Sequence, residues 1–230
     1  MKIGCVVVAL LFCGLISQID GVCRCRRGCR YHPRRRCSGY PNKCYKGWSG
    51  PYCQRKNVAF EGTTAQSDQY SVLMSPGFAV DGNTNPNTAI QCAMTGESNN
   101  AWWNVRLSRN GINQIKYMKI YNLDYDPERR TGMEILVNGN VCYQFPPWEI
   151  PEVVESITCD ETMVGDVVTI RVPGSHLTLC EVEVYVCSDY WFGQNCDKEC
   201  HCAIRGEICD KGTGACESGC APGYNGTDCQ

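Results

Sequence analysis

Apolar and polar residues alternate in several short runs through the middle of the chain. The run EVEVYV at 181–186 alternates strictly, and VVTIRV at 167–172 is rich in β-branched residues. IKYMKIYN at 115–122 and MEILVNG at 133–139 have a similar pattern, and turn-forming stretches such as ERRTG and VPGS separate the runs. A period of two predicts β-strands, and no long amphipathic helical pattern accompanies them. Several short strands in one domain predict an all-β protein built as an antiparallel sandwich.

The first residues have the pattern of a secretory signal peptide. One lysine precedes an apolar run from Cys5 to Ile16, and small and polar residues follow it. The run is short for a membrane span, and the pattern predicts cleavage between Ser17 and Gly21. No second apolar run long enough to cross a bilayer follows. We therefore assign residues 1–21 to the signal peptide and expect a secreted, extracellular protein.

The cysteines divide the rest of the chain into three blocks. Of 20 cysteines, Cys5 and Cys13 lie in the signal peptide, and the remaining 18 comprise six in 23–53, four in 92–180 and eight in 187–229. A dense, even count in an exported chain indicates disulfides, and zinc-type CxxC pairs are missing. The central block is long enough to bury its own core, whereas the outer blocks need their bridges. We expect modules at 22–56, 57–187 and 188–230.

Charge is unevenly distributed. Between Cys23 and Lys56 there are eleven Lys and Arg and no Asp or Glu, whereas from Asn57 onward there are ten Lys and Arg against 23 Asp and Glu. Disulfides would hold this basic head together, so it should bind acidic extracellular polymers rather than nucleic acid. Its candidate residues are Arg24, Arg26, Arg27, Arg30, Arg34, Arg35 and Arg36. A solvated charged face, or a processing site at 34–36, is the alternative.

The sequence gives no sign of catalysis. The three histidines, His32, His176 and His201, stand in no Ser/His/Asp or Cys/His arrangement, and the mature cysteines are all expected in bridges. No HExxH, Walker-type or Gly-x-Ser-x-Gly motif occurs. We expect no enzymatic activity and no catalytic residues. Asn225-Gly226-Thr227 is a glycosylation acceptor.

The outer blocks resemble EGF-like modules. Cys44 to Cys53 and Cys220 to Cys229 each enclose eight residues with glycines and an aromatic residue, as in an EGF-type closing turn. The last block resembles the repeats of multiple-EGF proteins. That resemblance implies the pairs Cys187–Cys196, Cys200–Cys209, Cys202–Cys216 and Cys220–Cys229. In the first block the pairing stays open, although Cys44 and Cys53 are expected in disulfides.

The central block resembles the F-type lectin domain. The motifs NVAFEGTTAQS, FAVDGNTN, NAWWNVRL, DxxxxRxxG at 124–132 and LTLCEVEVYV occur in that order. The resemblance covers about 57–187 and implies a jelly-roll β-sandwich of the galactose-binding-like type. It also implies a bridge between Cys92 and Cys180, and Cys142 and Cys159 are expected in disulfides as well.

The same resemblance implies a calcium site. The family's ligands correspond here to Asp81, Asn83, the Cys180 backbone and the Glu181 carboxylate, with Gln91 in place of a serine. A bridge from Cys92 to Cys180 would bring the two carboxylates together, and paired carboxylates favour a hard cation. The alternative is an ordinary Asx turn at 81–83 with Glu181 on the surface.

The sugar-binding pattern of the family is only partly present. Asp124 and Arg129 match it, and the resemblance implies that the aspartate orients the arginine. Met94, however, stands for the family's histidine, and Asn122 or Leu123 for its first arginine. Tyr125 and Asp126 replace an adjacent cysteine pair. Each lost charge-assisted hydrogen bond contributes roughly 1.5–3 kcal/mol, so the fucose site should be weakened about a hundredfold or more. The alternative is a solvated charged loop at 121–132.

We therefore expect a secreted, calcium-stabilised carbohydrate-recognition or adhesion protein, lectin-like and of innate-defence type. The competing hypothesis is an extracellular matrix or scaffold protein that binds acidic polymers through its basic head. Weak lectin sites usually need several copies, so a homo-oligomer would suit the first hypothesis.

Overall fold

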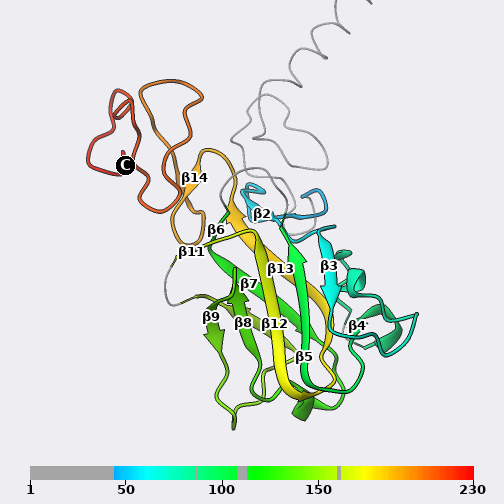
Figure 1. The fold of residues 1–230 in the computed structure, drawn as a ribbon. Helices are drawn as coiled ribbons and strands as arrows, with labels where there is room; N and C mark the ends of the chain where they lie inside the picture. The colour runs from blue at the N-terminus through cyan, green and yellow to red at the C-terminus, as the bar shows by residue number, and fades with distance from the viewer. Residues whose placement is uncertain (1–43, 86, 108–112, 160–161) are drawn as a thin grey trace, which may run out of the picture.

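The computed structural model describes residues 44–85, 87–107, 113–159 and 162–230, and these form an all-β protein (Figure 1). Two antiparallel sheets face one another, and two short ribbons accompany them. Three 3₁₀ helices complete the described elements: η1 (Pro76–Val80), η2 (Ala89–Gln91) and η3 (Pro127–Arg130). No helix in the described part of the chain is long and apolar enough to span a membrane.

The first sheet has the order β1-β2-β13-β7-β10, with β4 pairing to β13 beside that path. Its strands are β1 (Trp48–Ser49), β2 (Arg55–Asn57), β4 (Ala93–Met94), β7 (Tyr117–Asn122), β10 (Val154–Ile157) and β13 (Thr178–Cys187). The second sheet has the order β3-β5-β12-β8-β9. Its strands are β3 (Thr63–Gln66), β5 (Ser98–Arg106), β8 (Glu134–Val137), β9 (Asn140–Gln144) and β12 (Val167–Ser175). The ribbons pair β6 (Gln114–Ile115) with β11 (Met163–Val164), and β14 (Trp191–Phe192) with β15 (Lys198–Glu199).

The four alternating runs of the sequence all form strands. The runs at 167–172 and 181–186 lie in β12 and β13. The run at 115–122 includes the end of β6 and all of β7, and the run at 133–139 contains β8. Along β7, every second side chain is buried, as a half-covered strand requires. The predicted antiparallel sandwich is therefore confirmed.

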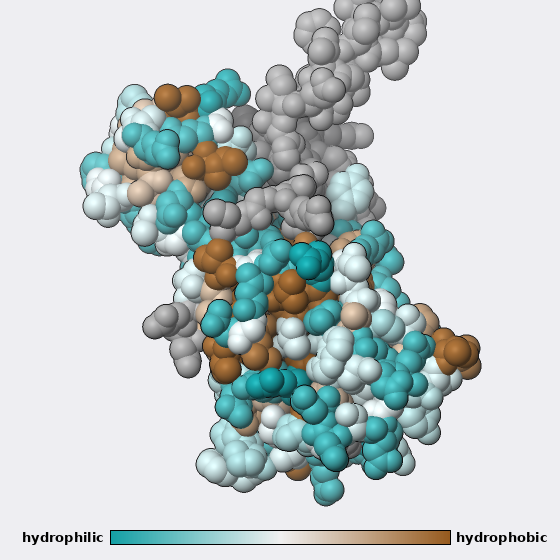
Figure 2. All heavy atoms as spheres, in the orientation of Figure 1, coloured by the Kyte–Doolittle hydropathy of each residue, from teal (hydrophilic) through white to brown (hydrophobic). Residues whose placement is uncertain are grey.

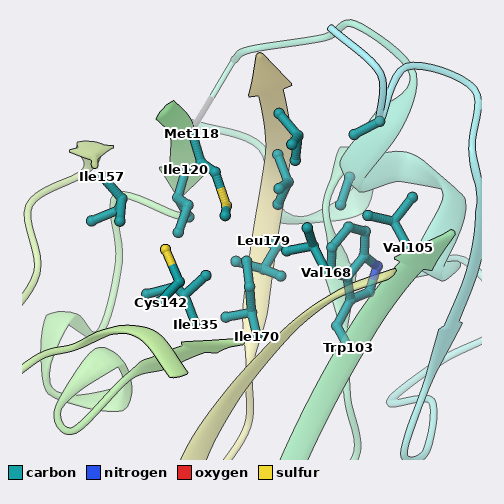
Figure 3. Packing of buried hydrophobic residues seen from close by; sticks show 14 of the residues in the cluster. Trp103, Val105, Met118, Ile120, Ile135, Cys142, Ile157, Val168, Ile170 and Leu179 are labelled. Atoms are coloured by element: carbon teal, nitrogen blue, oxygen red, sulfur yellow. The ribbon is translucent and has the colours of Figure 1, made fainter. Parts of the chain in front are cut away.

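The core lies between the two sheets. Figure 3 shows Trp103 and Ile170 of one sheet packing toward Ile120 and Leu179 of the other. Trp103 is 1% exposed and its ring N–H donates to the Pro76 carbonyl at 3.0 Å, which fixes η1 against the sandwich. The Cys142–Cys159 bridge joins β9 of one sheet to the segment after β10 of the other.

The outer modules meet at one end of the sandwich. The Tyr52 and Trp191 rings stack with their centroids 5.0 Å apart, and Ser188 donates its N–H to the Gln54 carbonyl at 2.8 Å. Strand β2 extends the first sheet next to β13, so the segment before the sandwich is built into it. The bridges here are Cys44–Cys53, Cys187–Cys196, Cys200–Cys209, Cys202–Cys216 and Cys220–Cys229, the same partners that the EGF resemblance implies for the last block.

Several predictions fall on residues 1–43, outside the described residues. These are the signal peptide at 1–21 and the polyanion-binding residues Arg24, Arg26, Arg27, Arg30, Arg34, Arg35 and Arg36. They stay predictions from the sequence.

Candidate functional site

The turn after η1 is held by its own polar side chains. Asn83 donates its backbone N–H to the Asp81 carboxylate at 2.8 Å, and Asn85 does the same to the Asn83 side-chain oxygen at 3.2 Å. Between them, Gly82 has a φ of +83°, a value that glycine adopts without strain. The Asn83 amide also donates to the Gln91 side chain at 3.1 Å. The predicted Asx turn is present, and it brings residues 81–83 beside the loop that ends at Cys92.

Glu181 lies beneath this turn. Its side chain is 0% exposed, and one carboxylate oxygen accepts the Gly82 N–H at 3.1 Å. The other oxygen is buried and receives no hydrogen bond within the described part of the chain. The alternative in which Glu181 is a surface residue is therefore wrong, because η1 and the following turn cover this part of β13. A buried carboxylate with one free oxygen needs a further positive or donating partner.

Two features of β13 aim Glu181 at the turn. The Cys92–Cys180 bridge ties the end of the loop to β13, with the two Cα atoms 4.0 Å apart. The register between β13 and β7 also shifts between Leu179 and Glu181, where Cys180 leaves the regular ladder. Such a bulge redirects side chains and releases backbone groups from pairing.

The electrostatics of Glu181 favour a bound cation. Burial raises the pKa of its carboxyl to about 8, and the nearby carboxylates of Glu183 and Asp81 add to the shift. The backbone N–H groups of Gly82 and Asp81 oppose it. A hard divalent cation would stabilise the ionised form, and carboxylate, amide and backbone oxygens are its preferred ligands. Asp81 lies close enough to Glu181 to affect its charge, and Asn83 and Cys180 adjoin these two residues along the chain. That the four residues bind calcium stays a prediction.

The predicted sugar-binding residues flank the start of β13. Met94 of β4 pairs with Thr178, and Asn122 at the end of β7 pairs with Leu179, so the two segments lie on either side of β13. Asp124 follows β7 and is exposed. Arg129 lies in η3 with 31% of its side chain exposed. Its guanidinium pairs with Asp126 at 2.6 Å, whereas the family pattern led us to expect Asp124 as its orienting carboxylate.

Met94 offers little surface to a ligand. Its side chain is 6% exposed, and the loop between β3 and η1 lies against its backbone. Tyr70 donates its N–H to the Met94 carbonyl at 3.1 Å, and the Gln66 amide donates to the same oxygen at 3.0 Å. The exposed side chain near Met94 comes from this loop instead, because Tyr70 is 58% exposed. The Tyr70 ring contacts the His176 ring edge-on.

Asn122 is enclosed rather than directed at a ligand. It is 0% exposed, and its amide donates to the Glu152 carbonyl at 2.7 Å. Its side-chain oxygen is buried and accepts no hydrogen bond from a described residue. Asn122, one of the two residues at the position of the family's first arginine, therefore links two loops, and the other, Leu123, is 8% exposed.

Arg130 is a buried cation that the sequence did not single out. It is 8% exposed and donates to the Leu123 carbonyl at 3.3 Å. Burial lowers its pKa, and Asp124, Glu152 and Glu155 oppose that shift. The motif assigns the sugar-binding role to Arg129, and two adjacent arginines give no signal of which one turns inward.

The remaining candidates lie in the last module. Asn225 is exposed, as a glycosylation acceptor must be. Cys202, Glu207 and Cys216 come within metal-binding distance of one another. Both cysteines are engaged in one disulfide, so this group is not a metal site.

Comparison with known proteins decides the family. Fucolectin-1 of Anguilla japonica is 34% identical over 146 residues, which cover 56% of this chain and 80% of that protein. The chain belongs to the fucolectin family. Fucolectin-5 of the same organism is 35% identical over 145 residues, covering 56% of this chain and 76% of that fucolectin. No model of a known protein family matches the chain.

A solved fucolectin has the same fold. The f-lectin from striped bass (Morone saxatilis) serum matches with a TM-score of 0.51 and 35% identity, over 57% of this chain and 48% of that chain. This chain thus spans about half the length of the striped bass fucolectin. The predicted F-type lectin domain is confirmed, while the EGF-like character of the outer modules stays a prediction.

Proposed function

We propose that the protein is a secreted, calcium-stabilised lectin that binds glycans at the end of the sandwich bearing Asp124 and Arg129. The observation that carries the proposal is the buried Glu181 carboxylate in a fucolectin fold. One of its oxygens is bound by Gly82, and the other has no partner among the described residues. This arrangement suits a cation that fixes the rim on which a ligand rests.

Calcium would be held by the side chains of Asp81, Asn83 and Glu181 and by the Cys180 backbone. When bound, the ion supplies positive charge that keeps Glu181 ionised and joins the 81–92 loop to β13. Gln91 accepts a hydrogen bond from the Asn83 amide, so it would help to orient the Asn83 side chain for calcium binding. The protein's own contribution is to hold these oxygens together through the Cys92–Cys180 bridge.

Arg129 is the cation best placed to donate hydrogen bonds to sugar hydroxyls. It keeps an exposed fraction of 31% although Asp126 occupies part of its guanidinium. Asp124 is exposed beside it and can accept a hydroxyl proton. Arg129 is one donor at a site where the F-type lectin pattern has three, so a single sugar should bind weakly. Several such sites on one oligomer would raise the overall affinity for a glycan.

The outer modules and the signal peptide complete the proposal. The fucolectin relatives and the dense disulfides support an extracellular, non-enzymatic protein with EGF-like modules at both ends. The closing turn of the last module exposes Asn225, which we expect to carry a glycan. A role in innate defence belongs to the same proposal.

A glycan array probed with the full chain tests the proposal. Calcium should support binding to neutral fucose-containing glycans, EDTA should remove it, and Arg129→Ala should abolish it. Arg106→Ala is the matched control, because Arg106 is also exposed and paired with a carboxylate, Asp166, at 3.2 Å. Binding that ignores EDTA and Arg129→Ala would contradict the proposal.

The same array distinguishes the lectin proposal from the scaffold hypothesis. Binding only to sulfated or acidic polymers, lost at high salt and on substitution of Arg34, Arg35 and Arg36, would assign the function to the basic head. The salt dependence of binding distinguishes the two hypotheses. Salt screens the exposed charge pairs of the basic head, and it should weaken binding at a calcium-organised sugar site much less.

A further inference from the structure

The connection between β9 and β10 presents a tryptophan to solvent. Trp148 is 82% exposed, the highest value for an aromatic side chain in the described residues. Tryptophan has a large apolar surface that is highly buried on average, and exposed tryptophan is enriched where proteins bind partners. The side chain contributes nothing to the core of the sandwich.

The turn that carries Trp148 is rigid. Glu149 donates its N–H to the Pro146 carbonyl at 3.0 Å, which places Pro147 and Trp148 at the centre of a turn. Proline at the first central position fixes the backbone there. Before the turn, Phe145 is 2% exposed and donates its N–H to the Met133 carbonyl at 2.9 Å. A backbone held in this way loses little conformational entropy when the ring binds a ligand.

This turn is fastened to the loop that carries the proposed sugar site. Asn122 donates its backbone N–H to Val153 at 2.7 Å and its amide to Glu152 at 2.7 Å. Glu152 is the fourth residue after Trp148, so their Cα atoms lie at most about 14 Å apart. Strand β9 runs toward the end of the sandwich where η3 lies (Figure 1). The segment that carries Trp148 is thus hydrogen-bonded, through Glu152 and Val153, to the loop that contains Asp124 and Arg129.

A sugar ring suits such a surface. One face of a pyranose carries mostly C–H groups, which pack against an aromatic ring while the hydroxyls stay in water. We propose that the Trp148 turn is a second saccharide subsite, which holds the apolar face of a neutral sugar ring adjoining the one bound at Asp124 and Arg129. This inference rests on the proposed lectin function and names the kind of glycan it takes.

The charges around the turn exclude acidic sugars. The segments 121–132 and 145–155 together carry six Asp and Glu and two Arg. Both arginines are already engaged, Arg129 with Asp126 and Arg130 with the Leu123 carbonyl. The end of the sandwich is mostly hydrophilic on the face seen in Figure 2. A sialylated or sulfated ring would be repelled by this excess of carboxylates, whereas neutral hydroxyls can donate to them.

Calorimetry on the full chain with calcium tests the inference. The probes are L-fucose, a neutral fucosylated trisaccharide and its sialylated counterpart. Trp148→Ala should weaken trisaccharide binding about fivefold to tenfold and leave L-fucose binding unchanged, since one aromatic contact contributes roughly that much. Trp148→Phe should restore most of the loss. Tyr45→Ala is the control, because Tyr45 is a 53% exposed aromatic residue in the first module.

The outcomes separate this inference from the proposed function. Wild-type protein that binds none of the three sugars overturns both. Sugar binding that is unaffected by Trp148→Ala, or weakened equally for L-fucose and the trisaccharide, overturns the subsite alone. Equal affinity for the sialylated trisaccharide overturns the selectivity for neutral sugars. Loss of a dimer in sedimentation, with trisaccharide affinity unchanged, would show that Trp148 contacts a second copy instead.

Discussion

Gly82 donates its backbone N–H to the Glu181 carboxylate at 3.1 Å, across 99 residues of sequence. This contact joins the turn after η1 to the closing strand of the first sheet. It satisfies only one oxygen of a carboxylate that is completely enclosed. Folding of this domain therefore buries a carboxyl group whose ionised form a bound cation would stabilise, so the proposed calcium binding should raise the stability of the fold.

Replacing Glu181 by glutamine should abolish stabilisation by calcium. A ligand at a hundred times its Kd adds about 2.7 kcal/mol, which for a chain of this size raises the Tm by about 5–10 °C. We expect this rise in wild-type protein and its absence in Glu181→Gln, measured by scanning calorimetry with calcium and with EDTA. Glu183→Gln is the matched control, since Glu183 is the next acid along β13 and pairs with the Tyr121 hydroxyl at 3.2 Å. A normal calcium response in Glu181→Gln would exclude Glu181 as a ligand.

Without calcium, stability should fall as the pH rises. The folded-state pKa of Glu181 is about 8, above its value of 4.5 in the unfolded chain. The folded state therefore binds the proton more tightly, so this contribution is complete below pH 4.5 and disappears as the pH rises through about 8. Urea unfolding in EDTA at pH 5.5, 7 and 8.5 should show wild-type protein losing several kcal/mol relative to Glu181→Gln.

The comparison with Glu181→Gln is needed because Lys211 titrates in the same range. Burial lowers the pKa of Lys211 to about 8, and its ammonium donates to the Ser188 carbonyl. Lys211 is present in both the wild-type protein and Glu181→Gln, so its contribution cancels when their unfolding free energies are subtracted. A difference in unfolding free energy that stays constant from pH 5.5 to 8.5 would contradict the burial of an ionisable Glu181.

The strands could be predicted from the sequence because their pattern reflects burial directly. In β7 and β12 the side chains that face the core are the apolar members of an alternating run, with Asn122 at the end of β7 as a buried polar exception. Glu181 breaks this rule. An acid in an alternating strand is expected on the solvent face, and that face is covered here by η1 and its turn. Only the resemblance to the F-type lectins pointed to the role that we propose for it.

The details of the sugar-binding loop were not predictable for a different reason. The motif predicts that Asp124 orients Arg129, whereas Asp126 does so in the structure. Asp126 has a φ of +46°, a left-handed conformation that places its carboxylate next to η3. Neither this backbone conformation nor the choice of which arginine turns inward can be read from the local sequence, because both arginines belong to the same short motif.

Removing the Cys92–Cys180 bridge should destabilise the protein and abolish its calcium response together. The bridge closes a loop of 88 residues, which corresponds to about 4–5 kcal/mol in the chain-entropy model. Replacing Cys142 and Cys159 by serine is the control, because that loop has 17 residues and corresponds to about 3 kcal/mol. Chemical unfolding with and without calcium should show that only the Cys92→Ser, Cys180→Ser double variant loses the calcium effect. A calcium effect that survives in this variant would mean that the bridge does not organise the site.

Freeing Arg129 from its ion pair should strengthen sugar binding. The Asp126 carboxylate lies 2.6 Å from the Arg129 guanidinium and competes with sugar hydroxyls for its donors. Asp126→Asn removes the charge, and asparagine tolerates the left-handed backbone conformation of Asp126. The pair is partly exposed, so its loss should change stability by less than about 1 kcal/mol.

Calorimetric titration with L-fucose should therefore give a several-fold lower Kd for Asp126→Asn, whereas Arg129→Ala should show no measurable binding. Asp166→Asn is the control, because it frees Arg106 on β5 in the same way without touching the sugar-binding loop. If Asp126→Asn and Asp166→Asn have the same Kd, Arg129 does not donate to the sugar. The exposed Asp124 and the Tyr70–His176 pair would then be the polar groups left to hold it.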